Sequence, residues 1–315
     1  MSNLFGQFNT IRYFFENSNL LIKLLISLLV MFACMAMLSF ISMILAMPLF
    51  HLSWEELESL LRSQAYDIDL AFLKYLQIIQ TVSLFIIPAL ILNHLLLNKE
   101  DNFIRKRKVP GINIILLIII TLVASVPVIN LLINWNDSLQ FPDWMSGIEN
   151  SMRQMEDERS QLTEKMLSGQ KTGDYIFNIF MIAVLPAIGE EFLFRGVIQK
   201  IISKSIGNIH WAIIFAAAIF SIFHMQFFGF IPRLILGIYF GYLLIWSDNI
   251  WLPVSAHFMN NTIAVSLDYL SNQSYFSHNL ERLDMATRGL LPVVLSIVTT
   301  TALIIITRAV LNSKK

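Results

Sequence analysis

The sequence has few charged residues. Asp, Glu, Lys and Arg make up only 14% of its 315 residues, whereas soluble domains usually carry about 25%. A chain with so little charge cannot cover a water-facing surface, and a hydrophobic share of 56% with a mean hydropathy of +0.65 agrees with this. These values exclude an ordinary soluble domain. The formal net charge is zero, so we expect no nucleic-acid partner.

Cysteine is almost absent. The single cysteine, Cys34, lies within an apolar run. One cysteine can form neither an intrachain disulfide nor a metal cluster. We therefore interpret Cys34 as a packed residue of a membrane helix.

Long apolar segments recur along the chain. A helix that crosses ~30 Å of hydrocarbon needs ~20 mostly apolar residues. By this measure the sequence predicts an all-α, polytopic membrane protein with about eight transmembrane helices in a bundle. We expect residues 1–315 to form a single transmembrane domain. The predicted spans cover roughly residues 20–48, 72–98, 112–135, 174–199, 209–225, 229–247, 250–268 and 288–311.

The first span is too long for the core of a signal peptide and lacks a clear cleavage site, so we expect a retained signal anchor. Basic residues then set the orientation, because Lys and Arg concentrate in cytoplasmic loops. With eight spans, every basic cluster falls on the same side as both termini. We therefore expect an integral protein of a bacterial cell (inner) membrane with cytoplasmic termini. The residues of these basic clusters are Arg12, Lys23, Lys99, Arg105, Lys106, Arg107, Lys108, Lys200, Lys204, Arg308, Lys314 and Lys315.

The longest polar segment, about 136–173, is predicted to lie outside the membrane. Apolar residues recur within it at spacings of three, four and seven, which predicts an amphipathic helix. We interpret it as a surface helix that rests on the bundle or on the lipid interface. The alternative is a lid or a dimer contact near a substrate entrance. The apolar positions are Met145, Ile148, Met152, Met155, Leu162 and Met166.

Three charges interrupt the fourth predicted span. Ionisable groups at membrane depth each cost about 2.5–3.5 kcal/mol, so they indicate a functional site. Glu191 and Arg195 are four residues apart and share one helix face, so we predict an ion pair. Glu190 points about 100° away and is the carboxylate available to face a polar cavity. Pro186 is expected to kink the helix beside it. The alternative is a helix end at the membrane surface with hydrated charges.

Two later spans also carry polar residues. His224 stands near the end of the fifth span, where a lone histidine is more often structural. His257 and Asn261 are four residues apart in the seventh span, so both project from one face. An amide and an imidazole in hydrocarbon need polar partners. The other histidines, His51, His94, His210 and His278, are weaker candidates.

This set of residues suits peptide hydrolysis, which needs a base for water and donors for the oxyanion. Glu190 with His224 could activate the water, while His257 and Asn261 could hold the oxyanion. Alternatively Glu190, His224 and His257 could bind zinc, since Glu and His are common zinc ligands. No His-Glu-x-x-His helix occurs, so a zincin is excluded. We assign no metal and predict no other cofactor, and spacing leaves both mechanisms open.

The polar residues also form three ordered motifs, each in an apolar segment. In this order they resemble the CPBP family of intramembrane endopeptidases, which includes CAAX prenyl proteases and the bacteriocin-processing or Abi proteins. The resemblance covers roughly residues 174–268, and nothing outside that region adds to it. The motifs are Glu190-Glu191-x-x-x-Arg195, Phe220-x-x-x-His224 and His257-x-x-x-Asn261.

The resemblance implies an eight-helix membrane fold with a cavity inside the bilayer. It implies that Glu190 is the catalytic base and that His224 lies beside it. By the same resemblance His257 and Asn261 stabilise the oxyanion, and the ion pair of the first motif supports the site. The family's dependence on metal is unsettled, and we favour glutamate-based hydrolysis without one. Members of the family act on membrane-associated peptides or proteins, so we expect such a partner within the lipid bilayer.

Two other functions are compatible with the composition. A proton-coupled transporter would use a midplane Glu and His, but transporters usually show two related halves. The first half of this chain has no counterpart of the charged block. A non-catalytic scaffold or a bacteriocin self-immunity protein of the same fold is the other alternative. The sequence names neither the substrate nor the oligomeric state.

Overall fold

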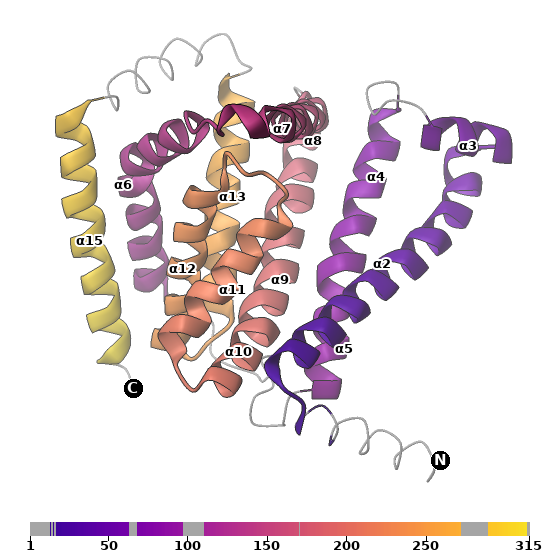
Figure 1. Cartoon of the computed structure of the whole chain (residues 1–315). Helices are drawn as coiled ribbons and strands as arrows, with labels where there is room; N and C mark the ends of the chain where they lie inside the picture. The colour runs from indigo at the N-terminus through magenta and orange to yellow at the C-terminus, as the bar shows by residue number, and fades with distance from the viewer. Residues whose placement is uncertain are drawn as a thin grey trace. The chain divides into compact units, whose positions relative to one another are not determined.

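The computed structural model is helical throughout the part of the chain that it describes (Figure 1). That part comprises residues 13, 15, 17–62, 68–96, 110–169, 171–271 and 289–313. The predicted all-α, polytopic membrane fold is confirmed. His278, Arg12 and most of the basic loop predicted at 98–111 lie outside the described residues.

Long apolar helices match most of the predicted spans. The fifth predicted span is a helix of only 15 residues, Ile209–Phe223. The seventh, Trp251–Ser271, has 21 residues, but polar side chains such as His257 and Asn261 lower its hydropathy. In the described residues, six helices are long and apolar enough to cross a membrane: Leu20–Phe50, Leu70–Leu95, Ile112–Asp137, Thr172–Ile206, Phe230–Ser247 and Leu290–Asn312.

The chain divides into two compact units. The first comprises Met1–Lys106 and Val184–Ala212, and the second comprises Arg107–Ala183 and Ile213–Lys315. The long helix Thr172–Ile206 passes from the second unit into the first. The prediction of a single domain for residues 1–315 stays a prediction.

The first unit packs its N-terminal helices through aromatic contacts. Phe72 of α4 meets the ring of Phe50 of α2 edge to face at 5.2 Å. The Tyr75 hydroxyl donates to the backbone oxygen of Ser42 at 2.7 Å, which ties α4 to α2. The elements of this unit are α2 (Leu20–Phe50), α3 (Trp54–Arg62), α4 (Leu70–Thr81), the π-helical η1 (Val82–Ile86), α5 (Ile87–Leu96), α9 (Leu185–Glu191), the π-helical η4 (Phe192–Ile198) and α10 (Gln199–Ile206).

The second unit has its own apolar core. Ile118 of α6, Leu243 of α12 and Leu252 of α13 are almost fully buried in one cluster. In Figure 1, α7 runs across the ends of the upright helices of this unit. Its elements are α6 (Ile112–Asp137), η2 (Asp143–Met145), α7 (Ser146–Leu167), α8 (Thr172–Asn178), the π-helical η3 (Ile179–Val184), α11 (Ile209–Phe223), α12 (Phe230–Ser247), α13 (Trp251–Ser271) and α15 (Leu290–Asn312).

A serine of α15 completes the hydrogen bonding of α6 beside a proline. Pro127 lies inside α6 and has no N–H to donate. The Ser296 hydroxyl of α15 donates to the Ala124 oxygen at 2.6 Å and accepts from the Val128 N–H at 3.3 Å. Polar side chains of neighbouring helices commonly satisfy the backbone groups that a proline disturbs in a membrane helix. This contact fixes α15 against α6.

The predicted helix within 136–173 is present as α7. Its apolar positions are not buried, because Ile148 is 53% exposed and Met155 is 41% exposed. Polar side chains of α7, including Glu156 and Arg159, contact the loop after α11. Its interpretation as a surface helix on the bundle or on the lipid interface stays a prediction, as does the alternative of a lid or dimer contact.

Candidate active site

Glu190 lies in a long helix whose turns change type on both sides of it. The π-helical segment η3 precedes α9, and the π-helical segment η4 follows it. Pro186 stands in the first turn of α9. Single π-helical turns inside α-helices often occur at functional sites. The helix therefore widens where the sequence predicts a kink.

The predicted ion pair is present next to Glu190. Arg195 Nη1 and Glu191 Oε1 are 2.9 Å apart, and the two side chains are 1% and 0% exposed. Their opposite charges cancel, so the pair adds little net charge to the apolar interior. Glu190 is itself buried, with 8% of its surface exposed. The first unit therefore holds one buried carboxylate beside a neutralised pair.

Gly189 lets α9 approach η1 closely. A Cβ atom at this position would lie 2.9 Å from Ile86 Cγ1 and 3.0 Å from Phe85 Cβ. Such distances are too short for carbon atoms, so a larger residue would push the helices apart. The rings of Phe85 and Phe194 also lie 6.1 Å apart. The residue before Glu190 is therefore set by helix packing.

In the second unit, His224 is held by the last turn of α11. Its Nδ1 atom lies 2.9 Å from the Phe220 backbone oxygen. A carbonyl oxygen only accepts, so Nδ1 carries the hydrogen of this bond. In the neutral ring Nε2 then carries the lone pair. This tautomer suits a histidine that accepts a hydrogen bond from water.

His257 lies in α13 among aromatic rings. It is 5% exposed. Its ring stacks on Phe240 at 5.3 Å, with an interplanar angle of 19°. The Phe220 ring meets it edge to face at 6.0 Å and also meets His224 at 4.8 Å. Phe220 therefore contacts both predicted histidines.

Asn261 of α13 binds the helix that leads to Glu190. Its Nδ2 donates to the Ile182 backbone oxygen at 3.1 Å. In an α-helix that oxygen would accept from residue 186, but Pro186 has no N–H. Asn261 thus supplies a donor for a carbonyl that the proline leaves without its α-helical partner. Only one of its two amide N–H groups is used in this bond.

The candidate residues belong to both compact units of the chain. Glu190 and the ion pair belong to the first unit, and the histidines with Asn261 belong to the second. Phe220 was named from the sequence only as the first residue of the second motif and was given no role at the site. Phe240 was not named, because it had no local signal. Among the described histidines, the weaker candidates His51, His94 and His210 are exposed.

A zinc site needs at least three nearby ligands from the protein. Within neither unit do the described residues include a group of three His, Cys, Asp or Glu side chains that could hold a metal ion. The six predicted site residues remain as one carboxylate, one ion pair, two imidazoles and one amide. Those groups can accept a proton, orient water and donate hydrogen bonds.

The fold and these buried groups define a polytopic helical membrane protein that carries polar chemistry in apolar helices. Residues 172–263 match the family model described as type II CAAX prenyl endopeptidase, Rce1-like. The chain therefore carries an Rce1-like domain of the CPBP family, which is a family of proteases, and the resemblance predicted from the three motifs is confirmed. The matched segment contains all six predicted site residues. Neither the curated proteins nor the solved structures include a match to the chain.

Proposed function

We propose that the chain is an intramembrane endopeptidase that hydrolyses peptide bonds with a glutamate-activated water. The observation that carries this proposal is the burial of Glu190 beside a pair that is already neutral. The ion pair of Glu191 and Arg195 keeps the local net charge low, and Glu190 is a buried carboxylate, a group that can act as a general base. The match of residues 172–263 to a family of proteases also supports a role in peptide hydrolysis.

In the proposed reaction Glu190 takes a proton from water, and the water oxygen attacks the carbonyl carbon of the scissile bond. The family resemblance assigns His224 to the same water, and Nε2 would be the accepting atom, since Nδ1 donates to the Phe220 backbone oxygen. The tetrahedral oxyanion accepts from His257 and from the second amide N–H of Asn261. The proton held by Glu190 then passes to the leaving nitrogen as the C–N bond breaks.

The proposed substrate is a membrane-associated peptide or protein. A site on apolar helices favours a substrate with an apolar anchor, because the anchor can enter from the bilayer. The matched family is described by its action on prenylated CAAX sequences. A farnesylated C-terminal peptide is therefore the first probe.

The test is cleavage of that peptide by the purified protein in lipid vesicles. We expect a shortened, still prenylated product detected by mass spectrometry, and faster cleavage than of the same peptide without the prenyl group. If neither peptide is cut, substrate trapping with Glu190→Gln in native membranes follows. Absence of both cleavage and trapped protein would favour a scaffold or an immunity protein of the same fold.

A metal-removal experiment separates the two hydrolytic mechanisms. In the metal-free mechanism that we favour, a strong chelator leaves the cleavage rate unchanged and purified protein holds no stoichiometric zinc. If zinc were the activator, chelation would remove activity and added zinc would restore it, because the metal generates the nucleophile. Metal analysis and the cleavage rate are measured on the same preparation.

We also propose that both termini face the cytoplasm of a bacterial cell. The proposal rests on the clusters of basic residues before the first predicted span, in the second and fourth predicted connections and at the C-terminal end, which eight spans place on one side. On this topology the loop at 49–71 and helix α7 face outward. Cysteine labelling at Ser313 and at Glu158 with a membrane-impermeant reagent tests it, since only Glu158→Cys should react in intact cells.

A further inference from the structure

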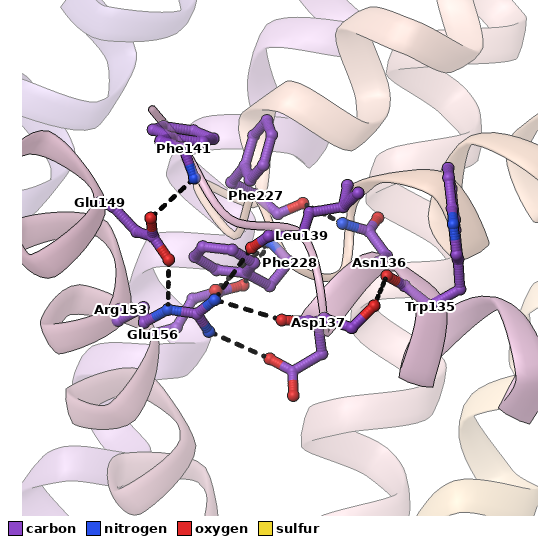
Figure 2. A network of polar contacts seen from close by, with 11 residues as sticks. Trp135, Asn136, Asp137, Leu139, Phe141, Glu149, Arg153, Glu156, Phe227 and Phe228 are labelled. Carbon is purple, nitrogen blue, oxygen red and sulfur yellow. Dashed lines mark hydrogen bonds and ion pairs between the residues drawn. The ribbon is translucent and has the colours of Figure 1, made fainter. Parts of the chain in front are cut away.

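The turn that carries His224 is held both by its own helices, where Arg233 of α12 donates to the Gln226 backbone oxygen at 3.2 Å, and by residues from elsewhere in the chain. We name residues 224–229, between α11 and α12, the His224 turn. Figure 2 shows that the end of α6 and helix α7 surround its second half with polar contacts. All of these elements belong to the second unit. The contacts come from residues that the mechanism above does not use.

The N-cap residue of helix α12 makes no side-chain hydrogen bond to the first turn of that helix. Gly229 is the N-cap and has no side chain to accept the first N–H groups. The Glu156 carboxylate of α7 takes this place, accepting from the Phe228 N–H at 3.2 and 3.3 Å and also from Gly229. Asn136 of α6 accepts from the Ile231 N–H at 2.9 Å. A negative charge at a helix N-terminus is stabilising.

Asn136 also binds the turn itself. Its Nδ2 donates to the Phe227 backbone oxygen at 3.1 Å, and the residue is only 1% exposed. The Phe227 ring meets Phe141 edge to face at 5.1 Å. The end of α6 and the segment after it therefore contact the His224 turn at the same place where Glu156 caps helix α12.

Arg153 fixes α7 in the position that this capping needs. Its guanidinium binds Glu149 at 3.0 Å, Asp137 at 3.3 Å and the Leu139 oxygen at 3.0 Å (Figure 2). Its face lies 3.8 Å from the centre of the Phe228 ring. Such a fork of donors is specific to arginine. The N–H of Phe141 and then the Arg153 side chain lower the pKa of Glu149, so this carboxylate stays ionised at neutral pH.

The first half of the turn is held by Arg159. Its Nη1 donates to the backbone oxygen of His224 at 3.2 Å. The next residue, Met225, has a φ of 51°, a left-handed conformation that is uncommon for a residue with a side chain. A strained turn persists only where its surroundings determine it. Arg159 on one side and Glu156 on the other supply such surroundings.

We propose that α7 sets the position of the His224 ring, with Glu156 and Arg159 as positioning residues. Both lie outside the matched segment 172–263, so this contact is a feature of this chain beyond the family match. The inference rests on the proposed function in one respect, that His224 orients the attacking water. Loosening the turn then displaces the imidazole without removing any group that touches the substrate.

The kinetic test compares Glu156→Ala with Glu156→Gln and with the control Asp157→Ala. Asp157 is the next residue on α7, is exposed and carries the same charge. We expect Glu156→Ala to lower kcat by about 10- to 100-fold, as small misplacements of catalytic groups do, with KM unchanged. Glu156→Gln retains an acceptor for the Phe228 N–H and should recover most of the loss. Asp157→Ala should behave as the parent.

A second measurement needs no activity. Diethyl pyrocarbonate modifies neutral imidazoles, and mass spectrometry gives the rate at each histidine. We expect Glu156→Ala and Arg159→Gln to raise the rate at His224 several-fold and to leave exposed His210 unchanged. Arg159→Gln serves if Glu156→Ala does not fold, because Arg159 is exposed.

The inference is overturned if diethyl pyrocarbonate modifies His224 in the folded variants at the same rate as in the parent. It is also overturned if Glu156→Ala changes both KM and kcat and Glu156→Gln recovers neither. A parent protein that cleaves no peptide would overturn the proposed function alone. The modification rates would still decide whether α7 positions His224.

Discussion

Replacing Glu190 by Gln is expected to abolish peptide cleavage while the protein still inserts and folds. Gln keeps the size and the hydrogen bonding of the side chain but cannot take a proton from water. A general base contributes about 10²–10⁴-fold to the rate, so kcat should fall by at least that range. The measurement is the cleavage rate of the farnesylated peptide, with yield and thermal stability recorded beside it.

The matched control for this variant is Glu164→Gln. Glu164 lies on α7 and is exposed, so the same chemical change there should leave the rate unchanged. Removing a buried negative charge also makes Glu190→Gln at least as easy to fold as the parent. Turnover that survives in a folded Glu190→Gln protein would disprove the assignment of the base.

Arg195→Ala is expected to destabilise the first unit strongly. The substitution leaves the Glu191 carboxylate buried at 0% exposure without the guanidinium 2.9 Å away. Removing one partner of a buried pair typically costs about 3–5 kcal/mol, because the other charge is left in an apolar interior. The expected result is a lower yield and a lower melting temperature in detergent.

A double variant separates loss of the pair from loss of packing. Glu191→Gln combined with Arg195→Gln removes both charges and keeps long side chains in both places. We expect it to be more stable than Arg195→Ala, since replacing both partners of a buried pair is often nearly neutral. An Arg195→Ala protein as stable as the parent would contradict the role of the pair.

Local spacing in the sequence was enough to predict several features that the structure has. The apolar runs predict the helices, because ~20 apolar residues in succession have few other stable environments. The spacing of Glu191 and Arg195 predicts their ion pair, because residues four apart face each other on a helix. The apolar periodicity of 145–166 likewise predicts α7. In each case the interacting residues lie within a few turns of one another.

Apolar patterns predicted the length and hydropathy of a span less well where polar residues occur within it. Helix α11 is shorter than its predicted span, and the polar side chains of α13 keep it below the hydropathy of the other spans. The stripe that includes Ile148 was predicted to rest on the bundle or on lipid. That interpretation stays a prediction, and the structure adds contacts of Arg153, Glu156 and Arg159 with the loop after α11 that the apolar stripe did not indicate.

Three contacts were decided only by the tertiary structure. Ser296 satisfies the backbone beside Pro127, which is 169 residues earlier in the numbering and in another helix. Asn261 donates to Ile182, and Glu156 caps α12. Each partner is a backbone group, which every residue has, so no side-chain pattern marks it in advance.

The sequence by itself therefore determined that this protein is a bundle of membrane helices with a buried carboxylate, an ion pair and two histidines. It did so because burial, helical period and local pairing are properties of neighbouring residues. The tertiary structure alone decided which distant side chains complete the backbone of those helices. That choice depends on which helix ends meet in space, and it placed Arg159 and Glu156 of α7 on the backbone of the His224 turn.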